Sequence, residues 1–324
     1  MEELATFVVL IVDATLRVAT PLILAALGGL FCERSGVVDI ALEGKMLGAA
    51  FAAAAMAAMS GSAWVGLLFG ILFALFLAMI HGYACVTHKG DQVVSGMAIN
   101  ILVAGLGPTL ALAWFKLGGQ TPALSGESRF RPIELPFADT LAEVPVVGAI
   151  YSEILSGHFI IVYFAFAAVP LAAWVVYRTR FGLRLRAVGE SPEAVDTAGI
   201  SVDRMRYQAL LVTGLLCGIA GAYLSTAQTA SFIRDMSAGQ GFIALAALIF
   251  GKWRPYPTML ACLLFALADA LQVRLQGVDI PGIGIIPVQF IQALPFVLTV
   301  IVLAGFVGRA VAPRASGIPY IKER

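Results

Sequence analysis

Long runs of apolar residues, each about long enough to cross a lipid bilayer, recur along most of this chain. A membrane-spanning helix needs about 20 such residues. By that measure the sequence predicts about nine segments: 7–30, 41–59, 63–85, 93–114, 158–177, 209–228, 240–251, 257–275 and 289–307. The segment 240–251 is too short to span alone and is predicted to be a broken or re-entrant helix. We therefore expect an all-α, polytopic transmembrane bundle of about eight to ten spans.

Composition supports a membrane protein and excludes several other classes. The 324 residues are 60% hydrophobic and 13% charged, whereas soluble proteins carry about 25% charged residues. A net charge of +1 gives no indication of nucleic-acid binding. The four cysteines lie in or beside apolar stretches without metal-ligand spacing, so we interpret them as small buried side chains. No linker or soluble segment divides the chain, and residues 1–324 are expected to form one membrane domain.

Lys and Arg are unevenly distributed between the predicted connections. The connection 178–208 contains six of the 21 basic residues, and further basic residues occur in the loop 252–256 and in the C-terminal tail. Alternating helix directions place all three on one side, which the positive-inside rule assigns to the cytoplasm. The connection 115–157, with three basic and five acidic residues, is then expected to be external.

Small residues are abundant and hint at an internal repeat. The chain has 33 glycines, and runs such as GAAFAAAAMAA at 48–58 favour close packing of helices in lipid. GKMLGAAFAAA, which follows Glu43, and GQGFIALAALIFG at 239–251 both begin with glycine and a polar residue and continue as a small-residue helix. Such similarity is a weak indication of two related halves.

The sequence contains no recognisable catalytic set, metal cluster or nucleotide-binding motif. The nearest string to a phosphate-binding loop, DIALEGKM at 39–46, lacks the first glycine and the final hydroxyl residue. We therefore expect a transport subunit that is not itself an enzyme and that binds no cofactor. Any active transport would then need a separate ATPase or an ion gradient.

Ionisable residues within the apolar segments are relevant to transport driven by an ion gradient, because ion-driven carriers usually have such residues. Asp13 and Arg17 are spaced i,i+4, and Asp269 lies near Arg274. We favour a structural interpretation, in which these residues form neutralising pairs or lie near the interface. An ion-coupled secondary transporter is the alternative hypothesis, and a channel-like protein without energy coupling is a third.

The connection 178–208 contains a predicted short helix. Ser191 is a good N-cap, Pro192 suits the first helical position, and Glu193 favours the positive end of the helix dipole. Gly199 predicts the end of the helix after about two turns. Composition alone allows either a solvated helix in a basic loop, which it slightly favours, or a docking element for a partner.

Four stretches resemble the permeases of bacterial ATP-binding cassette (ABC) importers for branched-chain amino acids, ribose and nucleosides. They are ATPLILAALGGLFCERSGVVDIALEGKMLGAAFAA (19–53), DQVVSGMAINILVAGL (91–106), GLRLRAVGESPEAVDTAGISVDRMRYQALLVTGLLCGIAGAYLS (182–225) and SAGQGFIALAALIFGKWRP (237–255). Asp39 and Ala41 replace the Asn and Gly that are more usual in the family. The resemblance covers nearly the whole chain. Within the family, the motifs are most similar to those of nucleoside (simple-sugar) permeases. It implies a fold like that of type II ABC importers.

The resemblance also implies a docking role for the segment 190–200, which matches the family's ATPase-coupling helix. The residues concerned are Glu190, Ser191, Pro192, Glu193, Ala194, Val195, Asp196, Ala198, Gly199 and Ile200. The implied partners are an ABC ATPase that uses ATP, a second permease chain and an extracytoplasmic nucleoside- or sugar-binding protein. The implied location is the bacterial cytoplasmic (inner) membrane. Permeases for simple sugars or branched-chain amino acids remain alternatives within the family.

Four residues are candidates for the substrate pathway. A nucleoside offers a flat base and hydroxyl groups, which suit aromatic and amide side chains. Asn100 lies within an apolar run, Gln240 and Phe242 open the predicted broken helix, and Glu43 lies at a similar break in the N-terminal half. Asn100 and Gln240 can equally well bond neighbouring helices, and for Glu43 a structural role is favoured.

Overall fold

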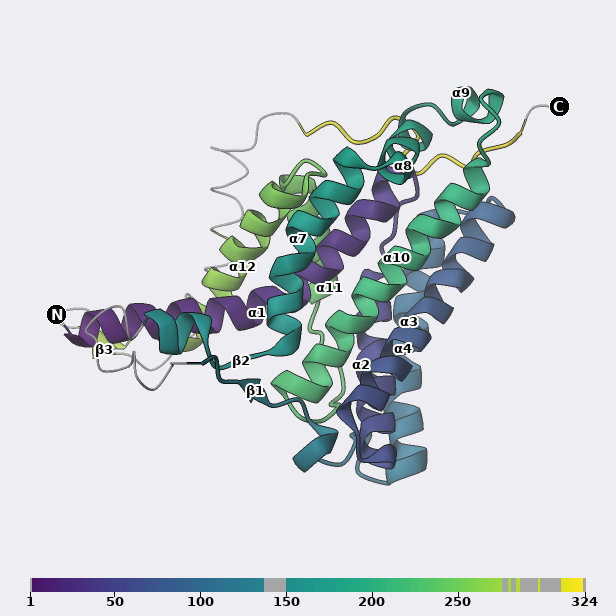
Figure 1. The fold of residues 1–324 in the computed structure, drawn as a ribbon. Helices are drawn as coiled ribbons and strands as arrows, with labels where there is room; N and C mark the ends of the chain where they lie inside the picture. Colours follow the sequence, from purple (N-terminus) through teal and green to yellow (C-terminus); the bar gives the residue numbers. More distant parts are fainter. Residues whose placement is uncertain are drawn as a thin grey trace.

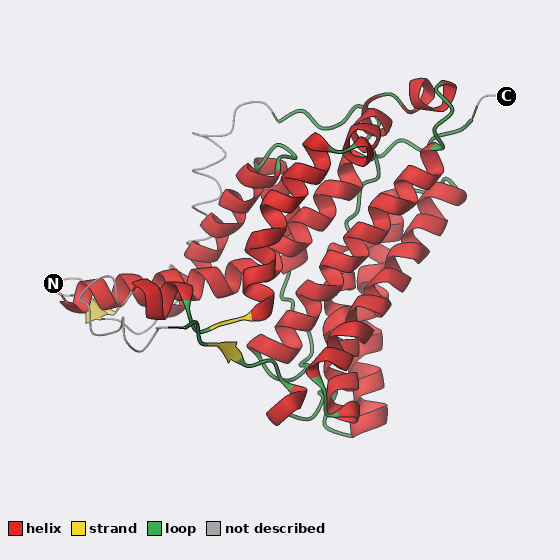
Figure 2. Cartoon of the chain, viewed as in Figure 1, coloured by secondary structure: helices red, strands yellow, loops and turns green. Residues whose placement is uncertain are grey.

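The computed structural model describes residues 2–136, 150–275, 279–280, 284–285, 297 and 310–322, and these ranges are mostly helical (Figure 2). The long helices are α1 (Glu2–Arg34), α2 (Leu42–Ser60), α3 (Ala63–Gly82), α4 (Gln92–Phe115), α7 (Ile160–Arg178), α10 (Val202–Tyr223) and α12 (Pro255–Leu275). Shorter helices are α8 (Arg180–Glu190), α9 (Pro192–Thr197) and α11 (Gln240–Phe250).

Short irregular elements complete the described chain. The π-helical turns η1 (Tyr83–Thr87) and η4 (Leu224–Gln228) extend α3 and α10, and η3 (Ile150–Leu155) precedes α7. The single 3₁₀ turn among the described residues is η2 (Gly126–Ser128). Strand β1 (Pro132–Ile133) pairs antiparallel with β2 (His158–Phe159), as β3 (Asp279–Ile280) does with β4 (Gly284–Ile285).

The helices agree with the spans that hydropathy predicts. Seven helices among the described residues are long and apolar enough to cross a membrane, and each overlaps one predicted segment. The predicted short helix is also present, because α11 has only 11 residues. The last predicted segment, 289–307, lies outside the described residues apart from Val297. The chain is therefore a multi-pass helical membrane protein.

Small residues let the central helices approach one another closely. Helix α10 contacts α1, α2 and α3 and lies near the middle of the bundle (Figure 1). A Cβ atom added to Gly218 on α10 would lie 2.6 Å from the Cα atom of Ile71 on α3. One added to Gly66 would lie 2.6 Å from the carbonyl oxygen of Ala53 on α2. Within lipid, such close contacts contribute much of the energy that holds helices together.

The two halves of the described bundle run in opposite directions. Helix α1 runs toward the end of the bundle that carries α8 and α9, whereas α10 begins at that end (Figure 1). Helix α1 packs on α11 and α12, the helices that follow α10, while α10 packs on α2 and α3, which follow α1. This reciprocal packing is typical of an inverted-topology repeat. It gives structural support to the weak similarity between the α2 and α11 sequences.

The basic segments gather at one end of the bundle, as the sequence predicts. The backbone N–H of Ala315 in the C-terminal tail donates to the carbonyl of Gly189 on α8 at 2.9 Å. The Arg34 guanidinium donates to the carbonyl of Trp253 in the 252–256 loop at 2.8 Å. The positive-inside rule assigns this end to the cytoplasm.

Candidate functional site

The segment 190–200, here called the docking element after its predicted role, contains the short helix that the sequence predicts. Pro192 occupies the first position of α9. Gly199 follows the helix with φ of +78°, a left-handed conformation that suits glycine, and its N–H donates to the carbonyl of Asp196 at 2.9 Å. One detail of the prediction is wrong. Ser191 stands at the N-cap position but its side chain makes no capping bond, because its backbone is not in the extended conformation of a cap.

The docking element has one anchored face and one free face. Pro192 and Val195 are buried against the body of the protein. The outward residues are exposed, namely Glu190, Ser191, Glu193, Ala194, Thr197, Ala198 and Gly199. The element is therefore held in place by one face, while its other face exposes backbone, small and acidic side chains.

The C-terminal segment 310–322 ties the docking element to the membrane helices. Besides the bond from Ala315 to Gly189, the Lys322 ammonium lies 3.2 Å from the Asp196 carboxylate. The N–H of Gly317 donates to the carbonyl of Gly36 in the α1–α2 connection at 3.1 Å. Sequence reasoning gave this segment no role beyond its positive charge, because its contacts are made with residues far away in the chain.

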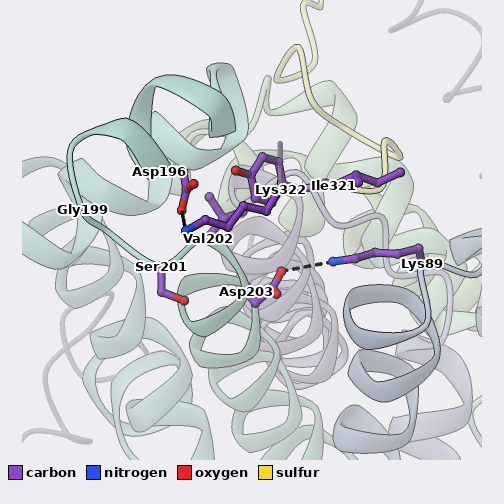
Figure 3. A pocket seen from close by; sticks show the side chains of 9 residues that line it. Lys89, Asp196, Gly199, Ser201, Val202, Asp203, Ile321 and Lys322 are labelled. Atoms are coloured by element: carbon purple, nitrogen blue, oxygen red, sulfur yellow. Dashed lines mark hydrogen bonds and ion pairs between the residues drawn. The ribbon is translucent and has the colours of Figure 1, made fainter. Parts of the chain in front are cut away.

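A cleft of about 530 Å³ lies between the docking element and the C-terminal segment (Figure 3). Gly199 and Asp196 line one side, and Ile321 and Lys322 line the other. Its charged groups are paired, since Lys322 faces Asp196 and the Lys89 ammonium lies 3.3 Å from the Asp203 carboxylate (Figure 3). The cleft is thus a nearly neutral recess beside the docking element.

The Glu43 side chain links the start of α2 to the start of α11. One oxygen of its carboxylate accepts hydrogen bonds from the Ser237 hydroxyl at 2.5 Å and the Gly239 N–H at 2.9 Å. The other accepts from the Gly241 N–H at 2.6 Å. A carboxylate at a helix N-terminus satisfies free N–H groups and interacts favourably with the helix dipole. Glu43 therefore caps α11 from the first turn of α2.

Asn100 on α4 also forms hydrogen bonds at the start of α2. Its side-chain oxygen accepts a hydrogen bond from the Gly44 N–H at 2.8 Å, and its amide nitrogen donates to the carbonyl of Ile40 at 3.0 Å. Asn100 is 8% exposed, so both polar ends of the amide are used inside the protein. Of the two interpretations of this residue, the geometry favours the one in which it bonds a neighbouring helix.

Gln240 and Phe242 differ from these two residues. The side-chain oxygen of Gln240 is buried without a hydrogen-bond partner among the described residues. The Phe242 side chain is 41% exposed on the first turn of α11. Both remain candidates for contact with a solute or another chain. Gly241, which lies between them in the sequence, donates its N–H to the Glu43 carboxylate.

A buried ion pair joins the residues that precede α2 to its first turn and is absent from the sequence-based predictions. Asp39 and Lys45 are both fully buried and form a salt bridge with each other. His81, also fully buried, lies 3.9 Å from the Asp39 carboxylate and bonds the Ser95 hydroxyl at 3.0 Å. The replacement of the usual Asn by Asp39 was visible in the sequence, but its partner six residues later was not recognised.

The ionisable pairs proposed from the sequence have different outcomes. The Arg17 guanidinium lies 2.9 Å from the Asp13 carboxylate, which confirms the neutralising pair on α1. Asp269 and Arg274 form no ion pair with each other. Within the described residues no group of three or more metal-binding side chains occurs.

An inverted repeat and a broken or re-entrant helix are features typical of polytopic membrane transporters. Residues 11–312 match the family model described as "Branched-chain amino acid transport system / permease component". The chain belongs to this family of permeases.

Individual relatives are similar over almost their whole length. The chain is 40% identical to the nucleoside ABC transporter permease protein NupC of Lactococcus lactis subsp. cremoris, over 97% of this chain and 98% of that protein. It is 39% identical to the guanosine ABC transporter permease protein NupQ of Bacillus subtilis, over 97% of both. It is 23% identical to a second L. lactis protein, the nucleoside ABC transporter permease protein NupB, over 95% of this chain and 83% of that protein.

Proposed function

We propose that this chain is the membrane-spanning permease subunit of an ATP-driven ABC importer for nucleosides. The single observation that carries the proposal is the near-full-length similarity, at 40% and 39% identity, to permeases named for nucleoside and guanosine transport. The architecture is compatible with it, because a re-entrant helix lies at membrane depth and an anchored helix is presented on the cytoplasmic side.

The docking element is the proposed contact with the ATPase. A separate subunit would bind and hydrolyse ATP, and this chain would bind neither ATP nor another cofactor. Pro192 and Val195 are buried while the rest of α9 is largely exposed. A movement of the bound ATPase would therefore shift α9 as a unit together with the part of the permease to which it is anchored. The free face carries Glu190 and Glu193, which suit a recess with basic residues at its rim.

Two further partners belong to the proposal. L. lactis contains two similar proteins that are both named nucleoside ABC transporter permeases, which supports a pore built from two different permease chains. An extracytoplasmic nucleoside-binding protein would deliver the solute to the external face. The proposed site of this assembly is the bacterial cytoplasmic membrane.

Co-purification and uptake test the proposal. The tagged chain, expressed with the neighbouring genes of its source genome, should bring down an ATPase and a second permease. Proteoliposomes containing the assembly should take up a labelled nucleoside only with ATP and the binding protein. Uptake by this chain alone under a proton or sodium gradient would contradict the proposal and favour an ion-coupled carrier.

A further inference from the structure

The connection between η4 and α11, residues 229–239, starts at the outer end of the bundle and re-enters the membrane. Its first half pairs with the external loop, since the N–H of Leu124 donates to the carbonyl of Ala230 at 2.7 Å. The N–H of Thr121 likewise donates to the carbonyl of Phe232 at 3.1 Å. Its second half ends at Glu43, which accepts from the Gly239 N–H. The connection therefore links the external loop to the start of α11.

Contacts along α4 place this connection in depth. Near the outer end, a Cβ atom added to Gly119 in the external loop would lie 3.3 Å from Pro108 on α4. Further in, a Cβ atom added to Gly44, which follows Glu43, would lie 2.8 Å from Asn100 on α4. At a rise of 1.5 Å per residue, Pro108 is about 10 Å from the outer end of α4 and Asn100 about 12 Å from its inner end. Residues 233–238 connect these two levels and thus lie in the middle part of the membrane.

Two charged side chains are exposed on this segment. Arg234 and Asp235 are both exposed, and neither forms an ion pair within the described part of the chain. A charge in contact with hydrocarbon is costly. Irregular backbone at this depth is tolerated only where it is buried in protein or lines a water-filled cavity. Exposure together with charge favours the cavity.

The segment is held in a defined shape. Asp235 and Ala238 have φ of +58° and +45°, conformations that cost energy for residues other than glycine. The bonds from Ser237 and Gly239 to Glu43 fix the same turn. Side chains on a fixed turn can offer a solute the same geometry in every transport cycle.

We propose that residues 233–242 line the aqueous translocation path, and that Arg234 and Asp235 hydrogen-bond the hydroxyl groups of an uncharged, sugar-containing solute. A guanidinium only donates and a carboxylate only accepts, so the pair matches neighbouring hydroxyls, which do both. Phe242, exposed at the start of α11, offers a flat apolar face to the rest of the solute. The identity of the solute rests on the proposed function, whereas the position of the path does not.

Cysteine accessibility tests the position of the path. The four native cysteines are free but buried, so the parent chain gives a low background. Arg234→Cys and Asp235→Cys, in the assembled complex in vesicles, should react with a charged, membrane-impermeant methanethiosulfonate added to one side or the other. Ile101→Cys is the matched control, because Ile101 is 70% exposed on α4 next to Asn100 but lies among apolar residues. Equal reactivity at residue 101, or no reaction at residues 234 and 235 from either side, would overturn the proposal.

A comparison of ribonucleoside and deoxyribonucleoside uptake tests whether Arg234 and Asp235 bind the sugar hydroxyls. Asp235→Asn and Arg234→Gln keep the approximate size but change the hydrogen bonding. If these groups bond a ribose, uptake of a ribonucleoside should fall about tenfold, while uptake of the corresponding deoxyribonucleoside should fall much less. Equal losses for both solutes would indicate a structural role or a pairing with the partner chain. If the complex transports no nucleoside, the proposed function fails, and the labelling experiment alone still decides whether the path lies here.

Discussion

The Glu43 carboxylate on α2 accepts a hydrogen bond from the backbone N–H of Gly241 on α11 at 2.6 Å. These two helices come from opposite halves of the inverted repeat, and each begins inside the membrane. The close contact depends on the absence of a side chain, because a Cβ atom on Gly241 would overlap the backbone of Glu43. One carboxylate thus fixes the point at which the two halves meet.

Glu43→Gln should destabilise the protein. The amide nitrogen of Gln cannot accept a hydrogen bond, so at least one buried donor among Ser237, Gly239 and Gly241 loses its partner. The expected loss is about 1–3 kcal/mol, measured as a lower midpoint of unfolding in detergent. Glu127→Gln, at an exposed position in η2, makes the same chemical change as a control and should have little effect. Equal midpoints for the two variants would show that the hydrogen bonds of Glu43 to the start of α11 do not stabilise the protein.

The Asp39–Lys45 pair predicts strong coupling between two substitutions. Lys45→Met leaves a fully buried carboxylate without its partner, which typically costs about 3–5 kcal/mol. Asp39→Asn in the same chain removes that charge. The double variant should therefore be more stable than Lys45→Met alone. A double-mutant cycle checks this, and additive losses would show that the ion pair is unimportant.

Replacement of Gly221 should disturb the packing of α10 against α2. A Cβ atom on this residue of α10 would overlap the carbonyl oxygen of Met46 on α2. Gly221→Ala should force the helices apart and cost about 1–3 kcal/mol. Gly105→Ala on α4, where a Cβ atom meets nothing within 4 Å, is the matched control and should be neutral or slightly stabilising. Yield and unfolding midpoint in detergent measure both, and a stable Gly221→Ala variant would contradict the close packing.

Gly199 predicts a conformational requirement in the docking element. At φ of +78° a β-branched side chain is strained, whereas Asn tolerates this region. Gly199→Val should reduce nucleoside-stimulated ATPase activity several-fold, and Gly199→Asn should largely retain it. Both variants should still insert in the membrane, because nothing lies within 4 Å of a Cβ atom at this position. Identical ATPase activities of the Gly199→Val and Gly199→Asn variants would show that the positive φ at this position is not required for coupling.

Much of the fold was predictable because hydropathy and helix-ending residues act locally. The seven long helices, the short α11 and the end of α9 at Gly199 all follow from such signals. The capping of α11 by Glu43 was not predictable, because Glu43 bonds residues almost 200 positions away. Only the resemblance between the two helix starts hinted at it. The pairing of Asp39 with Lys45 and the role of the C-terminal segment depend in the same way on the three-dimensional arrangement.

The candidate site was predicted unevenly for a related reason. Pro192 and Gly199 predicted the limits of the short helix α9 well, and its docking role stays a prediction. For the pathway it selected polar residues in apolar runs, and Asn100 proved to be bonded on both sides within the protein. Arg234 and Asp235 were missed, because a charged pair in a presumed loop gives no indication that the loop lies at membrane depth.

The most direct test of the central claim is the number of solute molecules taken up per ATP hydrolysed by the reconstituted complex. Residues 190–200 would be replaced by a glycine–serine sequence of the same length, with assembly checked by co-purification. Uptake should fall much more steeply than basal ATP hydrolysis, so that the ratio approaches zero. An unchanged ratio would contradict the claim that this element couples the permease to its ATPase.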